Sequence, residues 1–304
     1  MQELVFLKLG GSLITDKTQA YTARHEKLAD LASQIARSLH KDPGLRLVLG
    51  HGSGSFGHTA AKKYGTRAGA PLRLPPFSSK MGGTMPSPPA PLPGGEGSES
   101  PSPFGGGIRG EGNYWRGFAE VWYQASTLNR YVIQALHEAG VPAMTFSPAA
   151  SVWSQDGRVV KWDLSQIEYA LEKEIVPVVH GDVIFDRARG GTILSTEDLF
   201  EHLARELHPR RILLAGLEEA VWADFPGRRH RVEVLTRASF NEISTGVGES
   251  AGADVTGGMQ SKVQQMLALV EQVAGLQALI FSGEEQGNIE KALKGERIGT
   301  LVIK

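Results

Sequence analysis

Short apolar runs alternate with amphipathic segments along most of the chain. Seven runs have the length and the branched side chains of buried strands, and they cover residues 4–9, 45–50, 141–146, 175–180, 211–215, 277–282 and 299–303. Between these runs, apolar residues recur at helical spacing, most regularly over 116–137 and 259–274. The alternation predicts an α/β fold with an open, mostly parallel central sheet that is covered by helices on both faces.

The segment 75–112 departs from this pattern. Residues 75–103 contain nine of the chain's 16 prolines, and glycine and serine fill much of the remainder. Such a composition buries too little apolar surface to offset the entropy lost on ordering. We therefore expect a disordered, low-complexity surface insertion, with a partner-binding proline-rich arm as the alternative.

Composition and charge narrow the classes of protein that this chain can represent. Its 304 residues include 32 Lys and Arg against 33 Asp and Glu, so no basic field favours nucleic-acid binding. The absence of cysteine excludes disulfides, thiolate catalysis and cysteine-ligated metals. No signal-like leader or membrane-length apolar stretch is present. We expect a soluble cytoplasmic protein with no nucleic-acid or membrane partner.

A glycine turn follows the first predicted strand and carries a lysine on either side. The strand ends near Lys8, the turn is Gly10-Gly11-Ser12, and a second lysine follows at Lys17. Glycine lets the backbone approach an anion closely, and a turn that opens a helix directs several N–H groups at one point. A lysine at the end of a buried strand is costly unless it meets an anion. The pattern favours phosphate binding over a lysine that merely extends to the surface.

The second predicted strand leads into a longer turn, His-Gly-Ser-Gly-Ser-Phe-Gly-His at 51–58. We expect a helix over 59–64, so that His58 lies near its N-terminus, where the helix dipole favours an anionic partner. His51, at the strand end, is expected to be a structural hydrogen-bonding residue. Ligands of such sheets bind beyond the carboxyl ends of the strands, where both turns fall. Two such turns predict a site for more than one phosphate, as phosphoryl transfer requires.

Three later clusters add candidate residues. Gly181 and Asp182 close the strand predicted over 175–180, and Asp182 is placed to orient lysines or the water of a metal. Thr196 lies in a polar turn before a predicted helix, where capping the helix and contacting substrate are both open interpretations. Gly258 lies in a Thr-Gly-Gly turn, and Lys262 follows one helical turn later, as in a clamp for nucleotide phosphates.

The chain contains neither a Walker A sequence nor the HRD and DFG signatures of protein kinases. Its ordered set of turns instead resembles the amino acid kinase superfamily and, within it, the isopentenyl phosphate kinase family. The histidine that ends the second turn is the more specific feature, and it is also similar to that of the fosfomycin kinases. The matching stretches span the chain and are KLGGSLITDK at 8–17, HGSGSFGH at 51–58, VVHGDVIFD at 178–186, TILSTED at 192–198 and DVTGGMQSK at 254–262.

The resemblance implies an αβα sandwich with two lobes that share one sheet. Residues 1–208 would bind the phosphate acceptor and form a homodimer, and residues 209–304 would bind ATP. The implied reaction transfers the γ-phosphoryl group of ATP to isopentenyl phosphate with the help of Mg²⁺, giving isopentenyl diphosphate and ADP.

The resemblance also implies a role for each matched residue, with no metal ligand among them. The catalytic candidates are Lys8 at the ATP phosphates, Lys17 at the transferring group, His58 at the acceptor phosphate, and Asp182, which would order the lysines. The implied ATP-binding residues are Lys8, Gly10, Gly11, Ser12, Gly54, Gly258 and Lys262. The implied acceptor-binding residues are Ser53, His58, Gly181 and Thr196.

Departures from the family pattern leave the acceptor and the nucleotide open. The family usually has glycine in place of Ser53, Ser-Gly-Asp-Asp at 195–198, and Thr-Asp-Val-Asp-Gly-Val at 216–221. A superfamily kinase with a phosphonate or carboxylate acceptor is one alternative. A nucleotide- or phosphate-sensing protein without turnover and an interaction protein built on the proline-rich segment are others. Four aromatic residues in or next to the helix predicted over 116–137 are candidates for lining a short prenyl pocket: Trp115, Phe118, Trp122 and Tyr123.

Overall fold

The computed structural model describes residues 3–66, 69, 109–243 and 258–304. All seven predicted strands are present in one eight-stranded sheet, with ends that differ from the prediction by at most two residues. Across the sheet the order is β12 (Val234–Leu235), β14 (Thr300–Val302), β13 (Gln277–Ser282), β9 (Arg211–Gly216), β1 (Glu3–Leu9), β2 (Leu45–His51), β6 (Val176–His180) and β3 (Ala143–Thr145). Every neighbouring pair is parallel except β13 with β14.

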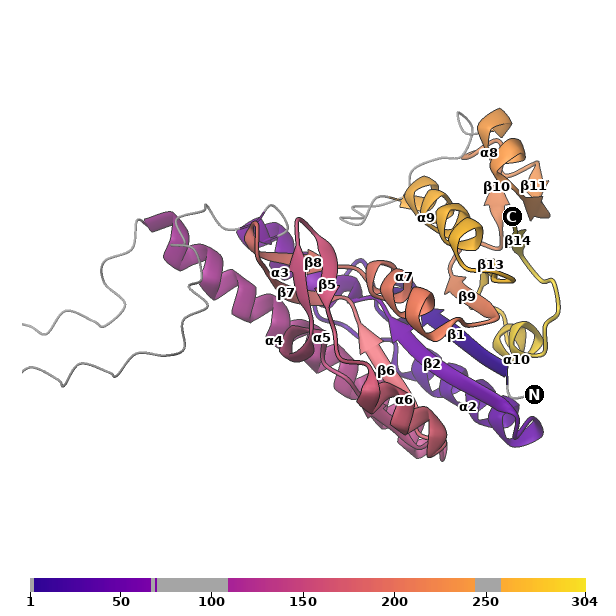
Figure 1. Cartoon of the computed structure of the whole chain (residues 1–304), viewed down its shortest axis with the longest axis horizontal. Coiled ribbons are helices and arrows are strands. Elements are labelled where there is room, and N and C mark those ends of the chain that lie inside the picture. Colours follow the sequence, from indigo (N-terminus) through magenta and orange to yellow (C-terminus); the bar gives the residue numbers. More distant parts are fainter. Residues whose placement is uncertain (1–2, 67–68, 70–108, 244–257) are drawn as a thin grey trace, which may run out of the picture.

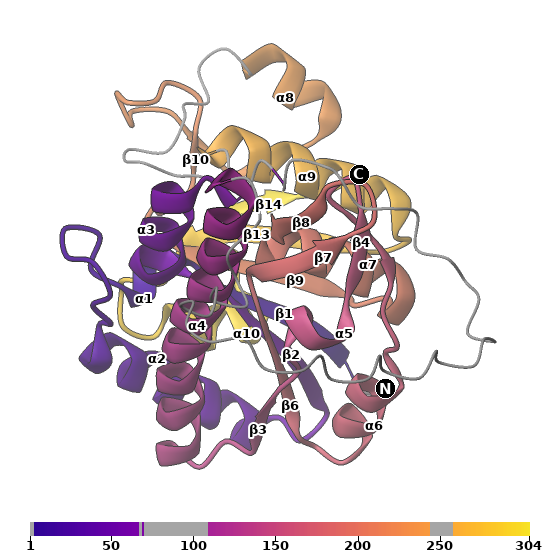
Figure 2. The ribbon, with the colours of Figure 1, turned by 90° about the vertical axis from the view of Figure 1, so that its left-hand side faces the viewer.

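Both faces of this sheet are buried, which explains why its strands read as continuous apolar runs. Alternate residues of β1 enter different cores: Phe6 packs on one face, and Val5 and Leu7 pack on the other. One face is covered by α6 (Ser165–Glu172), α7 (Thr196–Leu207) and α9 (Gly258–Gln272). The other is covered by α2 (His25–Lys41), α4 (Arg109–Glu138) and α10 (Asn288–Leu293). Figure 2 shows α2 and α4 on one side of β1, β2 and β6, with α6 and α7 on the other, which confirms the αβα arrangement.

Short elements escaped the sequence prediction because they lack a long apolar run. A second sheet has the order β5 (Arg158–Lys161), β4 (Trp153–Gln155), β7 (Asp182–Asp186) and β8 (Gly190–Leu194). Its β7–β8 turn is held by the carboxylate of Asp186, which accepts the N–H groups of Ala188 and Arg189. The remaining short elements are α5 (Pro148–Ser151), α8 (Arg237–Ile243) and the ribbon of β10 (Val221–Trp222) and β11 (Arg231–Val232).

Helix α4 begins earlier than the sequence prediction placed it. Residues 109–112, the end of the expected insertion 75–112, belong to the helix, because the next turns bury Tyr114 and Phe118 against α3 (Gly54–Tyr64) and β7. The rest of that insertion lies outside the described residues. Figure 1 shows α4 alongside α3 and the small sheet, while the elements after residue 208 gather at the opposite side. No helix in the described part of the chain is long and apolar enough to cross a membrane.

Candidate active site

One cleft lies beyond the carboxyl ends of β1, β2, β6 and β9 and receives most of the predicted site residues. It contains about 1560 Å³ of empty space, counting the solvent at its mouth. Eleven of the thirteen predicted residues line it: Lys8, Gly10, Gly11, Ser12, Lys17, Ser53, Gly54, His58, Gly181, Thr196 and Lys262.

The two glycine turns form one bonded unit at the floor of the cleft. They approach so closely that a Cβ on Gly11 would lie 2.5 Å from the backbone nitrogen of Gly54. Gly54 has a φ of +51°, in the region where a side chain is strained. The Thr15 hydroxyl donates to the carbonyl of Gly11 at 2.7 Å and accepts the N–H of Ser55 at 3.0 Å. Glycine is therefore required here for the turns to meet.

Each turn leads directly into a helix, α1 (Gly11–Ile14) after the first and α3 after the second. The predicted start of the second helix at residue 59 is wrong by five residues, because the Ser53 carbonyl accepts the N–H groups of Phe56 and Gly57, both at 3.1 Å. His58 therefore lies within α3, after its first turn. The N-terminus of this helix, at Ser53 and Gly54, lines the cleft, as expected for an anion-binding turn.

Lys8 meets a carboxylate that the sequence analysis did not single out. Its ammonium group forms a buried ion pair with Glu197, the second residue of α7. Burial alone would raise the pKa of Glu197, but the charges of Lys8 and Lys262 and the hydrogen bond from Lys8 together hold it below its usual value. Glu197 is thus an anion between two lysines of the cleft. The sequence did contain an indication of such a residue, because a lysine at the end of a buried strand needs an anionic partner.

The start of α7 explains how Glu197 is placed. Ser195 caps the helix in a reciprocal capping box: its hydroxyl accepts the N–H of Asp198, and the Asp198 carboxylate accepts the N–H of Ser195. The polar turn is therefore a helix cap, but its capping residue is Ser195, and Thr196, for which capping was one of two interpretations, is the first residue of the helix. Because Asp198 is used in the cap, Glu197 is the acidic residue of this turn that faces Lys8.

The predicted role of Asp182 in ordering lysines disagrees with its position. Asp182 lies outside the cleft lining, where one oxygen accepts the N–H of Val183 at 2.8 Å and the other lies 3.5 Å from His180 Nε2. Burial raises the pKa of Asp182 despite these contacts. Among the described residues its partners include no lysine. In this fold the carboxylate paired with Lys8 is Glu197.

Thr196 and Gly181 join the ends of two strands at the cleft wall. The Thr196 hydroxyl donates to the carbonyl of His51 at 2.6 Å, and it accepts the N–H of Gly181 at 3.1 Å. That N–H also lies 3.2 Å from the His51 carbonyl oxygen. The hydroxyl of Thr196 and the N–H of Gly181 thus have partners within the protein that hold the cleft wall in place, and the contact of both residues with the acceptor stays a prediction.

The C-terminal part of the chain supplies the remaining cation. Helix α9 begins at Gly258, whose φ is +69°, and Lys262 on the next turn lines the cleft. Gly258 itself does not line it, although the adjacent Met259 does. Residues 254–257 of the predicted clamp lie outside the described residues. Lys8, Lys17, Lys262 and His58 thus face one space from four different segments.

Apolar side chains also line this space. Ala61 follows His58 by three residues on the same face of α3 and joins Val121 and Ile193 in the lining. Leu217, Trp222 and Phe225 line the part of the cleft contributed by the segment after β9. The four aromatic residues proposed for a prenyl pocket are not in the lining: Phe118 is buried in a small core, Trp115 packs against that core, and Trp122 and Tyr123 are exposed.

Two histidines lie stacked beneath the cleft at the ends of β2 and β6. Their ring centroids are 5.2 Å apart and the rings are nearly parallel. His51 is fully buried, with Nδ1 3.2 Å from the Gly52 carbonyl and Nε2 3.1 Å from the side-chain oxygen of Asn129. Burial, with the charges of His180 and Lys8, lowers the pKa of His51 to about 3. This supports the structural role predicted for His51.

We expect the variant His51→Asn to be less sensitive to acid than the wild type. Native His51 stays neutral down to about pH 3, whereas an unfolded histidine takes up a proton below about pH 6.5. Unfolding therefore binds a proton between these values, and His51 lowers the free energy of unfolding by about 1.4 kcal/mol per pH unit as the pH falls. Urea titrations at several pH values should show a shallower decline for the variant, and equal slopes would contradict this assignment.

The fold and the cationic cleft define a class of protein. A model of the amino acid kinase family matches residues 3–282, most of the chain. The chain belongs to the amino acid kinase family.

Individual relatives narrow the comparison further. The isopentenyl phosphate kinase of Methanothermobacter thermautotrophicus is 30% identical, and that of Methanocaldococcus jannaschii is 28% identical, each with 98% of both chains covered. A crystal structure of an isopentenyl phosphate kinase matches with a TM-score of 0.74 and 27% identity, covering 98% of this chain and 99% of the other.

Proposed function

We propose that this protein transfers the γ-phosphoryl group of ATP to isopentenyl phosphate, giving isopentenyl diphosphate and ADP. The observation that carries the proposal is the single cleft in which two glycine turns meet Lys8, Lys17, Lys262 and His58. Its full-length relatives bear the name of this activity. The small apolar group Ala61, Val121 and Ile193 beside His58 suits a short hydrocarbon chain.

The chemistry of this reaction needs cations more than it needs a base. A phosphate monoester has a second pKa of about 6, so near neutral pH its oxygen is already largely deprotonated and nucleophilic. The barrier is the approach of one anion to another. Positioning and charge neutralisation therefore dominate catalysis, as in other phosphoryl transfers. We assign Lys8 and Lys262 to the ATP phosphates, Lys17 to the transferring group, and His58 with Ser53 to the acceptor phosphate.

Glu197 takes the ordering role in this proposal. A buried lysine without an anion in the free enzyme would carry a large desolvation cost. The Glu197 carboxylate supplies that anion and fixes the direction of the Lys8 side chain before ATP binds. Because its charge also acts on Lys262, Glu197 aligns the lysines of both lobes toward one phosphate group.

We include Mg²⁺ as a companion of ATP. No group of three or more His, Asp or Glu suited to a metal ion occurs among the described residues. Mg²⁺ commonly keeps several waters and binds through one or two carboxylates together with substrate phosphates. When bound, the ion would neutralise part of the phosphate charge, and Glu218 is a carboxylate of the cleft within the nucleotide lobe.

Three wider features belong to the same proposal. We assign acceptor binding to residues 1–208 and ATP binding to residues 209–304, which share the central sheet. We also propose that the protein is a homodimer, from its family resemblance, and that it is cytoplasmic, as the sequence analysis expects. Light scattering of the purified protein tests the oligomeric state directly.

An ADP-release assay with a panel of acceptors tests the reaction. We expect turnover with isopentenyl phosphate of about 1–100 s⁻¹, the usual range for kinases. Dimethylallyl phosphate, fosfomycin, glutamate and acetylglutamate complete the panel. Turnover restricted to fosfomycin or to a carboxylate would favour another kinase of the family. Binding of ATP without turnover on any acceptor would favour a sensing protein.

A further inference from the structure

The segment that carries Lys17 is a narrow loop closed at its base. The backbone N–H of Asp16 donates to the Thr22 carbonyl at 2.9 Å, and Thr15 and Ala23 form an isolated antiparallel bridge. Lys17 lies in the exposed part of this loop, just beyond the bridge. The position of its ammonium group therefore depends on what holds the base of the loop.

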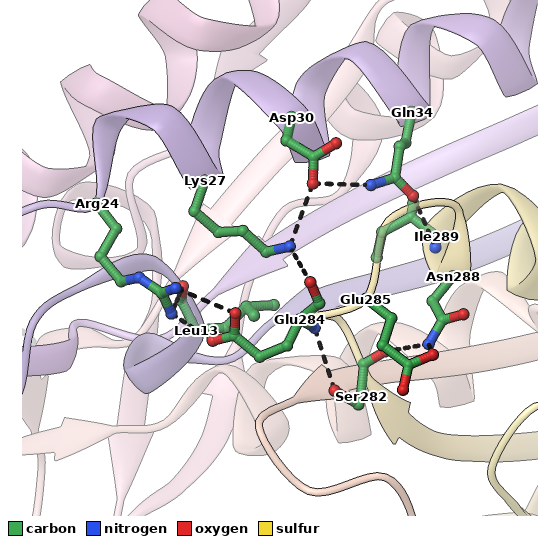
Figure 3. A network of polar contacts seen from close by, with 10 residues as sticks. All are labelled: Leu13, Arg24, Lys27, Asp30, Gln34, Ser282, Glu284, Glu285, Asn288 and Ile289. Atoms are coloured by element: carbon green, nitrogen blue, oxygen red, sulfur yellow. Dashed lines mark hydrogen bonds and ion pairs between the residues drawn. The ribbon is translucent and has the colours of Figure 1, made fainter.

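Arg24 holds that base from the start of α2. Its N–H donates to the Ile14 carbonyl at 2.9 Å, and its guanidinium donates to the Leu13 carbonyl at 3.1 Å. The same guanidinium forms a two-pronged ion pair with Glu284, just after β13, in which the Nη2–Oε2 distance is 3.0 Å. Figure 3 shows Arg24 extended between the Leu13 backbone and the Glu284 carboxylate.

Glu284 is itself fixed on the C-terminal lobe. Its N–H donates to the Ser282 hydroxyl at 3.1 Å, and its carbonyl accepts the ammonium group of Lys27 at 2.7 Å. Lys27 also pairs with Asp30 of the same helix at 3.1 Å. Two side chains at the start of α2, those of Arg24 and Lys27, therefore contact Glu284 (Figure 3). The backbone of Glu284 is thus held at both its N–H and its carbonyl, which fixes the position of the carboxylate that Arg24 contacts.

The contribution of the Arg24–Glu284 ion pair to the stability of the fold is too small to account for this network of contacts. Both side chains are about one-third exposed, and ion pairs of that kind contribute at most about 1 kcal/mol to stability. The geometry has a clearer consequence: the pair joins a carbonyl of α1 and the base of the Lys17 loop to the lobe that receives ATP. An error of about 1 Å in the position of a catalytic group can cost about 100-fold in rate.

We propose that Arg24 is a positioning residue that ties the Lys17 loop to Glu284, so that Lys17 reaches the transferring phosphoryl group. The inference rests on the proposed function, because it concerns the step in which Lys17 acts. Arg24 lies outside the lining of the cleft and acts through Lys17.

Steady-state kinetics of the full chain test this role. We expect Arg24→Ala to lower kcat about 10- to 100-fold while the KM for isopentenyl phosphate changes by less than about twofold. Arg37→Ala is the matched control, because Arg37 lies on the same helix and pairs with Glu290 of α10 without touching the Lys17 loop. That control should keep wild-type kinetics. An unchanged kcat in Arg24→Ala would overturn the proposal.

A double-mutant cycle separates positioning from general stability. If Arg24 acts through Lys17, adding Arg24→Ala to Lys17→Ala should change kcat by less than about twofold, whereas independent effects would multiply. Glu284→Gln, which leaves Arg24 intact, should reproduce the loss, and the swapped pair Arg24→Glu with Glu284→Arg should recover part of it. Multiplying effects in the cycle, or a Glu284→Gln variant with full activity, would overturn the inference. A wild type without kinase activity would instead contradict the proposed function.

Discussion

Replacing Lys8 with methionine is expected to lower kcat about 10²- to 10³-fold, the usual loss when one donor to a developing transition-state charge is removed. Lys8 is buried, lines the cleft and is held there by Glu197, so a mobile surface side chain is poorly placed to replace its charge. Lys63→Met is the control, because Lys63 is an exposed lysine of α3 that pairs with Glu120 outside the cleft.

The same substitution is expected to destabilise the fold, since it leaves the buried Glu197 carboxylate without its partner. Removing one member of a buried pair costs about 3–5 kcal/mol. Adding Glu197→Gln removes the uncompensated charge and should restore most of the free energy of unfolding, while kcat stays low. If the double variant regained activity along with stability, Lys8 would have only a structural role.

Replacing His58 with alanine is expected to raise the KM for isopentenyl phosphate and to lower turnover. A hydrogen bond to a charged group contributes about 1.5–3 kcal/mol, so kcat/KM should fall about 10- to 100-fold. The KM for ATP should change little, because His58 lies on α3 beside the apolar residues that we assign to the acceptor.

The control for this variant is His40→Ala, which removes a histidine from the last turn of α2, outside the lining of the cleft. Initial rates measured over a matrix of ATP and acceptor concentrations give both KM values from one data set. A His58→Ala enzyme with the wild-type KM for the acceptor and full turnover would remove His58 from the site.

Several identifications followed directly from local sequence. The strands were recognisable because both faces of the central sheet are buried, which makes each strand a continuous apolar run. The glycine turns were recognisable because two backbone segments can approach this closely only where the residue has no side chain, as at Gly11 and Gly54. Strand ends of a parallel sheet share one edge, so the order of elements alone was enough to bring Lys8 and His58 into one cleft.

The sequence by itself therefore determined the central sheet, the two phosphate-binding turns and the cations that follow them. Only the tertiary structure decided which carboxylate forms an ion pair with Lys8. Asp182 and Glu197 lie close together in the sequence, each beside a strand end, and nothing local distinguishes them. The pairing of Lys8 with Glu197 spans 189 positions and depends on how α7 packs over the sheet, whereas Asp182 contacts His180, two residues away in the sequence. A buried charge takes the partner that packing brings within reach, and packing is a property of the whole chain.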